Sequence, residues 1–192
     1  HFISETVEPK FYRWCERAIE RRYLRPRAIY GYYPCYSHEN ELVVLQPPGH
    51  ADAFKPLARF NFPRQPQGRR LCLSDFFRRK DLAESQGFDV VALTLVTMGD
   101  TPSLVGQDLF AKNRYDDYLH FHGLAVESTE AMAELLHKRV RHELGIGSHD
   151  APLTEQLFSQ GYQGSRFSFG YPACPRLEDH VRVFIDANEA KL

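Results

Sequence analysis

A chain of 192 residues has the length of one domain, and folding at this size buries roughly 70% of the unfolded chain's surface. Lys and Arg number 24 against 25 Asp and Glu, and the net charge of −1 argues against a nucleic-acid binder that relies on bulk positive charge. No apolar stretch approaches the roughly 20 residues that span a bilayer, and no signal peptide opens the chain. We therefore expect neither a nucleic-acid nor a membrane partner.

The cysteines indicate a reducing compartment. The four cysteines lie far apart and form no C-x-x-C pair: Cys15, Cys35, Cys72 and Cys174. We therefore expect neither a disulfide framework nor a zinc site, and we expect the protein in the cytoplasm. The chain begins at His1 and not at Met, which indicates a piece of a longer protein.

The first predicted element is an N-terminal helix within residues 1–26. Apolar residues recur there at three- and four-residue steps, and Pro26 ends the pattern. Arg13, Arg17 and Arg21 form a basic stripe at four-residue spacing. The stripe is typical of a solvated helix face, with a docking surface as the alternative.

A sheet is predicted within residues 27–100. The turn residues Ser37–Asn40 separate two short strands, which favours an antiparallel hairpin, and further strands follow as a meander. This order indicates the α+β class with an antiparallel sheet. The expected strands are Ala28–Tyr33, Leu42–Leu45, Ala58–Phe62 and Asp89–Met98.

The next predicted element is a long helix over residues 108–145. One apolar stripe runs along it, and Gly145 is a natural stop. A short helix at Leu153–Gly161 and an amphipathic run from Glu178 follow. The expected architecture is an antiparallel sheet packed against a long helix and shorter helices.

The segment 161–175 is the most informative part of the sequence. It is long for a loop and rich in aromatic residues, and Pro172 and Pro175 favour an extended backbone whose polar groups a ligand could contact. Gly170 has no Cβ, so another group can approach it closely. Arg166 offers a planar set of donors suited to a carboxylate. The alternative is a rigid surface turn with Arg166 in a salt bridge.

This segment also carries a family resemblance. Arg166, Gly170 and Tyr171, followed by Pro172-Ala173-Cys174-Pro175, resemble the R-x-x-x-G-Y-P-A-C-P signature of the C-terminal activation domain of cobalamin-dependent methionine synthase. The resemblance covers roughly residues 25 to 180. Other matches in the same order are Ile29–Pro34, Leu73–Phe77, Asp116–Tyr118 and Ala131–Arg141.

The resemblance implies a site for S-adenosylmethionine in a shallow groove, held largely by backbone groups. Arg166 matches the arginine that meets the methionyl carboxylate, and Tyr171 matches a residue that also faces the corrin. Glu130 matches an acidic residue near that site, where a carboxylate suits a sulfonium and an ammonium; the alternative is an exposed helix glutamate. The binding residues implied are Arg166, Gly170, Tyr171, Pro172, Ala173 and Glu130.

Two departures from the family pattern stand out. The acidic residue that grips the ligand's amino group has no clear match in His1–Glu8, and the family continues past Leu192 with tyrosines that complete the pocket. Gln160 stands where some relatives carry a glutamate. The resemblance therefore implies a single activation domain over residues 1–192, shortened at both ends and with a partial ligand site.

Competing chemistries find little support. Gly145 and Gly147 follow a helix and not a first strand, unlike the glycine-rich turn of a Rossmann methyltransferase. His120 and His122 point to different faces of a helix, so they form no metal pair. Cys174 lacks an evident histidine partner. We expect no catalytic and no metal-binding residue.

The implied function is reactivation of the parent methyltransferase, which moves a methyl group from methyltetrahydrofolate to homocysteine. The domain would present S-adenosylmethionine to cob(II)alamin held by the cobalamin-binding module of the same enzyme, while flavodoxin or another flavoprotein reductase supplies an electron. Zinc is expected only elsewhere in the parent, and the isolated piece is expected to be inactive. The alternative function is a non-catalytic docking module that caps a corrinoid protein or recruits its reductase.

Overall fold

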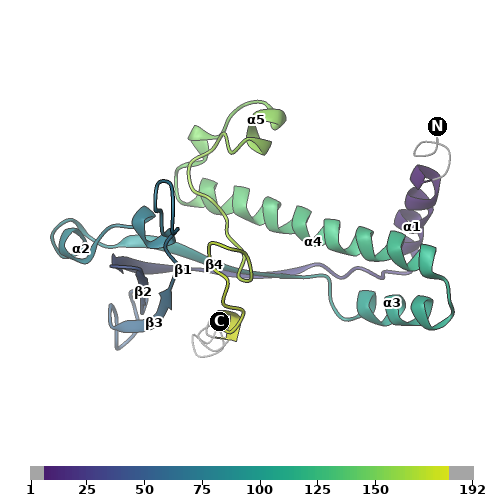
Figure 1. Cartoon of the computed structure of the whole chain (residues 1–192), viewed down its shortest axis with the longest axis horizontal. Helices are drawn as coiled ribbons and strands as arrows, with labels where there is room; N and C mark the ends of the chain where they lie inside the picture. Colours follow the sequence, from purple (N-terminus) through teal and green to yellow (C-terminus); the bar gives the residue numbers. More distant parts are fainter. Residues whose placement is uncertain (1–6, 182–192) are drawn as a thin grey trace. The chain divides into compact units, whose positions relative to one another are not determined.

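The computed structural model describes residues 7–181 and divides the chain into two compact units (Figure 1). Within the described residues, the helical unit comprises 7–29 and 94–163, and the sheet unit comprises 30–93 and 164–181. The fold is α+β, as the sequence predicts. Among the described residues, no helix is long and apolar enough to cross a membrane.

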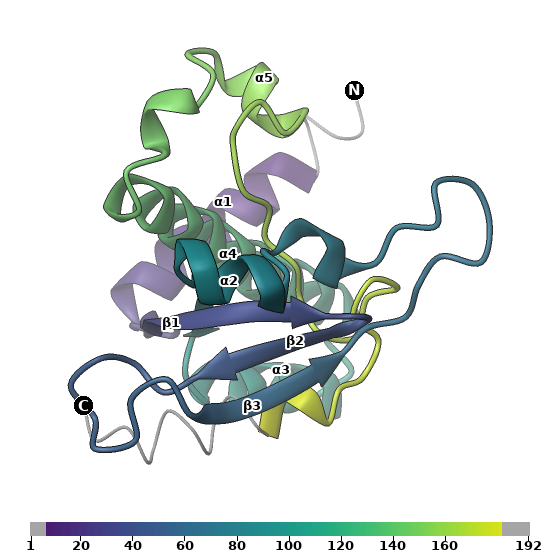
Figure 2. The same ribbon diagram turned by 90° about the vertical axis from the view of Figure 1, so that its left-hand side faces the viewer.

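Four strands form one antiparallel sheet in the order β3-β2-β1-β4. Figure 2 shows β3, β2 and β1 side by side. The unit boundaries at residues 29–30 and 93–94 fall inside β1 and β4, so both strands continue past the sheet unit. The strands are β1 (Arg27–His38), β2 (Glu41–Leu45), β3 (Pro56–Asn61) and β4 (Asp89–Thr97).

The β1–β2 hairpin is tighter than the sequence predicts. His38 pairs with Glu41, so only Glu39 and Asn40 form the turn, and Glu39 takes a left-handed φ of 54°. The predicted first strand stopped at Tyr33, whereas β1 continues to His38. The hairpin itself is confirmed, and its longer first strand places more side chains against β2.

The sheet unit has an apolar core on one face of these strands. Phe60 is 1% exposed, and Val44 and Cys35 are fully buried. In the second half of β1 burial follows a period of two, the spacing that puts alternate side chains on one face, whereas β2 is buried on both faces from Leu42 to Leu45. The buried members of this core are Tyr33, Cys35, Leu42, Val44, Phe60, Phe62, Cys72 and Cys174.

Two short elements connect β3 to β4, and the sequence analysis did not predict them. The 3₁₀ helix η2 (Leu73–Phe76) is followed by helix α2 (Lys80–Gln86). Arg64 donates from both terminal nitrogens to Asp75 at 2.7 Å, which fixes the loop that leads into η2.

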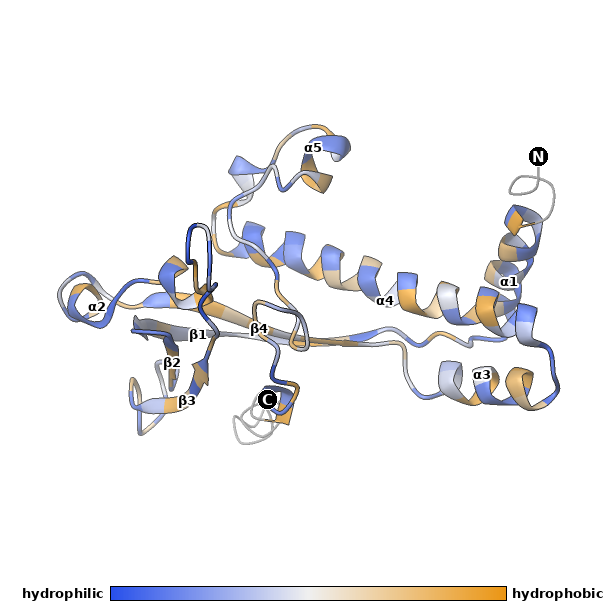
Figure 3. Ribbon diagram, viewed as in Figure 1, coloured by the Kyte–Doolittle hydropathy of each residue, from blue (hydrophilic) through white to orange (hydrophobic). Residues whose placement is uncertain are grey.

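The helical unit is built on one long helix, α4 (Tyr115–Glu143), with α3 (Thr101–Ala111) and α1 (Glu8–Glu20) packed against it (Figure 1). Hydrophobic and hydrophilic residues alternate along α4, as expected of a helix with one apolar face (Figure 3). The predicted start of the long helix at residue 108 was wrong, because Asn113 takes a left-handed φ of 56° and separates α3 from α4.

Aromatic contacts hold α1 to α4. Phe121 is fully buried, with its ring centroid 5.2 Å from that of Trp14 and 5.7 Å from that of Tyr23. Trp14 also donates from its indole nitrogen to Asp117 at 3.2 Å. The helix predicted within residues 1–26 ends at Glu20, because Arg22 takes a φ of 51°.

The end of α4 confirms the predicted glycine stop. Gly145 has a φ of 76°, its N–H donates to His142 O at 3.1 Å, and the N–H of Ile146 donates to Arg141 O at 2.9 Å. These two bonds are a Schellman motif, which satisfies the last carbonyls of a helix. Two short helices follow, η3 (Gly147–His149) and α5 (Thr154–Phe158). Most of the amphipathic run predicted from Glu178 lies outside the described residues.

Candidate functional site

Within the segment singled out in the sequence, residues 170–174 form a tight turn in the sheet unit. The N–H of Cys174 donates to Tyr171 O at 2.9 Å, and the N–H of Gly170 donates to Cys174 O at 2.9 Å. Pro172 occupies the second position of this turn, where its fixed φ suits the bend. The turn therefore has a defined backbone that the sequence alone dictates.

Gly170 is required by the backbone and by a neighbour. Its φ is 95°, and a Cβ built there would lie 2.8 Å from Cδ2 of Leu177. The close approach predicted from the missing Cβ is thus made by a side chain of the same unit. Any larger residue at Gly170 would strain the turn and push Leu177 away.

The inner side of the segment is anchored in the core. The Phe169 ring lies 5.7 Å from that of Phe60, and the Cys174 thiol donates to Ser168 O at 3.0 Å. Burial raises the pKa of the Cys174 thiol, and the negative charge of Asp179 adds to the effect. A buried thiol of raised pKa is a poor nucleophile, so Cys174 has a packing role.

The outer side of the segment carries the predicted binding residues. Tyr171 is 64% exposed, Pro172 is exposed, and Arg166 and Ala173 are half-buried. A terminal nitrogen of Arg166 donates to Ser168 Oγ at 3.4 Å, a long bond within the same segment. Within eight residues the segment therefore offers a cation, an aromatic ring and backbone polar groups.

Glu130 and Gln160 belong to the other unit. Glu130 lies exposed on α4, and Gln160 follows α5 with a left-handed φ of 60°. The grouping of Glu130 with Arg166 in one ligand site stays a prediction.

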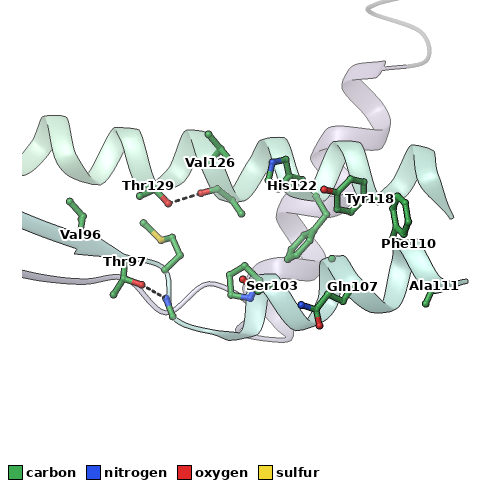
Figure 4. A pocket seen from close by; sticks show the side chains of 16 residues that line it. Val96, Thr97, Ser103, Gln107, Phe110, Ala111, Tyr118, His122, Val126 and Thr129 are labelled. Carbon is green, nitrogen blue, oxygen red and sulfur yellow. Dashed lines mark hydrogen bonds between the residues drawn. The ribbon is translucent and has the colours of Figure 1, made fainter. Parts of the chain in front are cut away.

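The helical unit contains an open cavity of about 730 Å³ that the sequence analysis did not predict (Figure 4). It lies between the end of β4, helix α3 and the first half of α4. Phe110, Tyr118 and Val126 give it apolar walls, and Gln107 and His122 add polar groups. Such a cavity suits a flat, mainly apolar group. The apolar stripe that lines it from α4 was interpreted as a core face, because periodicity alone does not tell a core from a cavity wall.

The histidines of α4 do not form a metal site. The His122 ring stacks on Tyr118 at 5.5 Å and 16°, and Nδ1 of His120 lies 2.8 Å from Asp116 O on its own helix. In residues 7–181 no group of three or more His, Cys, Asp or Glu side chains is placed to hold a metal ion.

Comparison with known proteins decides the family. The model of a family described as "Vitamin B12 dependent methionine synthase, activation domain" matches residues 12–189. The chain belongs to this family. Methionine synthase of Mycobacterium tuberculosis (strain ATCC 25618 / H37Rv) is 42% identical over 193 residues, and that of Mycobacterium leprae (strain TN) is 43% identical over 189. Each alignment covers 94% of this chain and 16% of the relative, so the chain spans about one sixth of these methyltransferases.

A solved structure shares the activation-domain fold. The crystal structure of the MetH reactivation domain bound to AdoHcy superposes with a TM-score of 0.79 at 22% sequence identity. The match covers 96% of this chain and 57% of that one. The α+β architecture predicted from the order of strands and helices is confirmed.

Proposed function

We propose that this activation domain binds S-adenosylmethionine and presents it to cob(II)alamin, so that reductive methylation restores a cobalamin-dependent methionine synthase. Cobalamin held by a neighbouring module of the parent supplies the cobalt that accepts the methyl group. Flavodoxin or another flavoprotein reductase supplies the electron. The chain's own residues bind and orient the methyl donor, and such positioning can lower a barrier by several kcal/mol. All four cysteines are free, which suits a cytoplasmic enzyme.

The observation that carries this proposal is the half-buried cation of Arg166 beside the exposed ring of Tyr171, on the signature segment of a chain of this family. A solved relative is bound to AdoHcy, which is S-adenosylmethionine without its transferred methyl group. Both ligands keep the amino-acid end, whose carboxylate is the natural partner of a guanidinium.

Each binding residue then has a distinct task. Arg166 pairs with the methionyl carboxylate, and the backbone of Gly170, Pro172 and Ala173 lines the ligand's edge. Tyr171, whose side chain is 64% exposed, turns its hydroxyl toward the corrin. Glu130 contributes a negative charge near the sulfonium and the ammonium, where opposite charges attract.

Calorimetry on the full-length protein that carries this chain tests the proposal. We expect Arg166→Ala to weaken S-adenosylmethionine binding by about 1.5–3 kcal/mol, the loss typical of a charge-assisted pair, or roughly 10- to 150-fold. Arg176→Ala is the matched control, because Arg176 is an exposed arginine of the same unit outside the signature core, and it should leave the affinity unchanged.

Two outcomes would contradict this assignment. If the wild-type protein gave no heat with S-adenosylmethionine, the domain would instead be a docking module. If Arg166→Ala lowered the melting temperature and left the affinity unchanged, Arg166 would serve the turn and not the ligand.

A further inference from the structure

Arg141 of α4 lies at the centre of a second cluster, in the helical unit. Its guanidinium carbon is 4.4 Å from the centroid of the Tyr162 ring, and the His137 ring meets the same tyrosine edge-on at 5.2 Å and 85°. His137 and Arg141 are four residues apart and share one face of the helix. Tyr162 is therefore held against α4 by a cation–π contact and an aromatic contact.

The position of Arg141 is itself fixed by an ion pair. Nε donates to Asp150 Oδ1 at 2.8 Å and a terminal nitrogen donates to Oδ2 at 2.7 Å. The two side chains are only 5% and 11% exposed. A buried pair contributes little net stability because desolvation offsets the attraction, but its two parallel bonds define the geometry.

The chain between Asp150 and Tyr162 forms a closed loop. The N–H of Ala151 donates to Gly161 O at 2.7 Å, and the N–H of Gly161 donates to Gln156 O at 2.8 Å. A Cβ on Gly161 would lie 2.7 Å from Gln156 O, so only glycine fits there. Both ends of the loop contact Arg141: Asp150 through the ion pair and Tyr162 through its ring.

The binding segment follows this loop directly in the sequence. The helical unit ends at Gln163, one residue after Tyr162, and Arg166 follows Tyr162 by four residues. Four residues reach at most about 14 Å, so a clamp on Tyr162 leaves only Gln163, Gly164 and Ser165 as free chain before Arg166.

We propose that Arg141, Asp150 and Tyr162 are positioning residues for Arg166, and that their clamp sets the affinity for the carboxylate of S-adenosylmethionine. The inference rests on the proposed function. With the clamp released, ligand binding must itself order the residues between Tyr162 and Arg166, and that ordering costs conformational entropy. The clamp therefore acts on ligand binding through the chain that leads to Arg166.

A double-mutant cycle on the full-length protein tests this coupling by S-adenosylmethionine calorimetry. Tyr162→Leu removes the ring but keeps an apolar side chain, and we expect it to weaken binding at least fivefold. Tyr162→Phe keeps the ring over the guanidinium, so its affinity should stay within twofold of the wild type. In the Arg166→Ala background, Tyr162→Leu should cost less than twofold, because the interaction it supports is already gone.

The outcomes separate this inference from the proposed function. Full affinity in Tyr162→Leu overturns the inference alone, and so does a double variant more than fivefold weaker than Arg166→Ala, since that result shows a general structural role. A wild-type protein that does not bind S-adenosylmethionine overturns both. If Tyr162→Leu does not fold, Asp150→Asn takes its place in the cycle: a loss of threefold or more that vanishes in the Arg166→Ala background supports the inference, and any other result overturns it.

Discussion

Asp75 illustrates how single side chains fix the loops of the sheet unit. Its oxygens accept hydrogen bonds from both terminal nitrogens of Arg64, and Oδ2 also accepts one from the N–H of Cys72 at 2.8 Å. The hydrogen bonds from Arg64 and then that from Cys72 lower the pKa of Asp75 to about 2. Its folded-state pKa thus lies below the value of about 3.9 that an unfolded aspartate has.

This difference predicts an acid-sensitive contribution to stability. Because the folded pKa is depressed, the contribution is complete above the unfolded value and is lost as the pH falls from about 4 toward about 2. Asp75→Asn should lower the melting temperature at about pH 6, and its difference from the wild type should shrink below about pH 4. Thermal unfolding followed by circular dichroism measures both.

A second aspartate provides the control for this experiment. Asp81 pairs with Arg79 at 2.7 Å, but both side chains are exposed, and such surface pairs contribute little. Asp81→Asn should therefore match the wild type throughout. If Asp75→Asn matched it too, the loop would not depend on its carboxylate.

At the level of elements, alanine should have opposite effects on stability at two glycines, one inside α4 and one just after its end. Gly145 ends the helix at a φ of 76°, whereas Gly123 lies inside it, and a Cβ on either would meet nothing within 4 Å. Gly145→Ala should lower the free energy of unfolding by about 1 kcal/mol, because alanine resists the left-handed conformation. Gly123→Ala should raise it by about 0.5–1 kcal/mol, because alanine favours the helix interior.

Melting temperatures of the two variants check this pair of expectations. A change of 1 kcal/mol shifts the midpoint by about 2–4 °C in a domain of this size, downward for Gly145→Ala and upward for Gly123→Ala. Equal shifts in the same direction would mean that the end of α4 does not depend on the Schellman motif.

The sequence predicted the elements that have strong periodicity and missed those fixed by single residues. The β-branched run of β4 was predicted to within one residue, since Asp89–Met98 was expected and Asp89–Thr97 is found. The break between α3 and α4 depends on the φ of Asn113, which no apolar pattern encodes. Helix α2 has seven largely polar residues and therefore no apolar face to detect.

The predicted site was recognisable for a different reason. The residues Arg166, Gly170 and Tyr171 carry a family signature. The structure adds why the segment is rigid: it has a proline turn, a required glycine, the buried Cys174 and the half-buried Phe169. The Arg141 clamp was missed because its members are distant in sequence, and a buried arginine and an exposed one look alike in a helical pattern.

At the scale of the whole molecule, the four cysteines are distributed over both units, so their reactivity measures how closed each unit is. Cys15 in the helical unit is half-buried, whereas Cys35, Cys72 and Cys174 in the sheet unit are 0%, 2% and 4% exposed. Burial raises the pKa of the Cys35 thiol, with a smaller effect from Asp89, and it also raises that of Cys174. The reactive thiolate is therefore scarce at these buried positions.

Thiol labelling of the native chain should consequently modify Cys15 first and the other three only after the sheet unit opens. Mass spectrometry after a short pulse of iodoacetamide identifies each site, and labelling in denaturant gives the total of four.

S-adenosylmethionine should slow the labelling of Cys174 more than that of Cys35, because a ligand that binds only the folded segment suppresses its local opening. Rapid native labelling of Cys35 or Cys72 would contradict the closed core of the sheet unit. If the ligand protects Cys174 in the wild type but not in Arg166→Ala, the protection depends on Arg166. Equal protection in both proteins would show that it does not depend on Arg166.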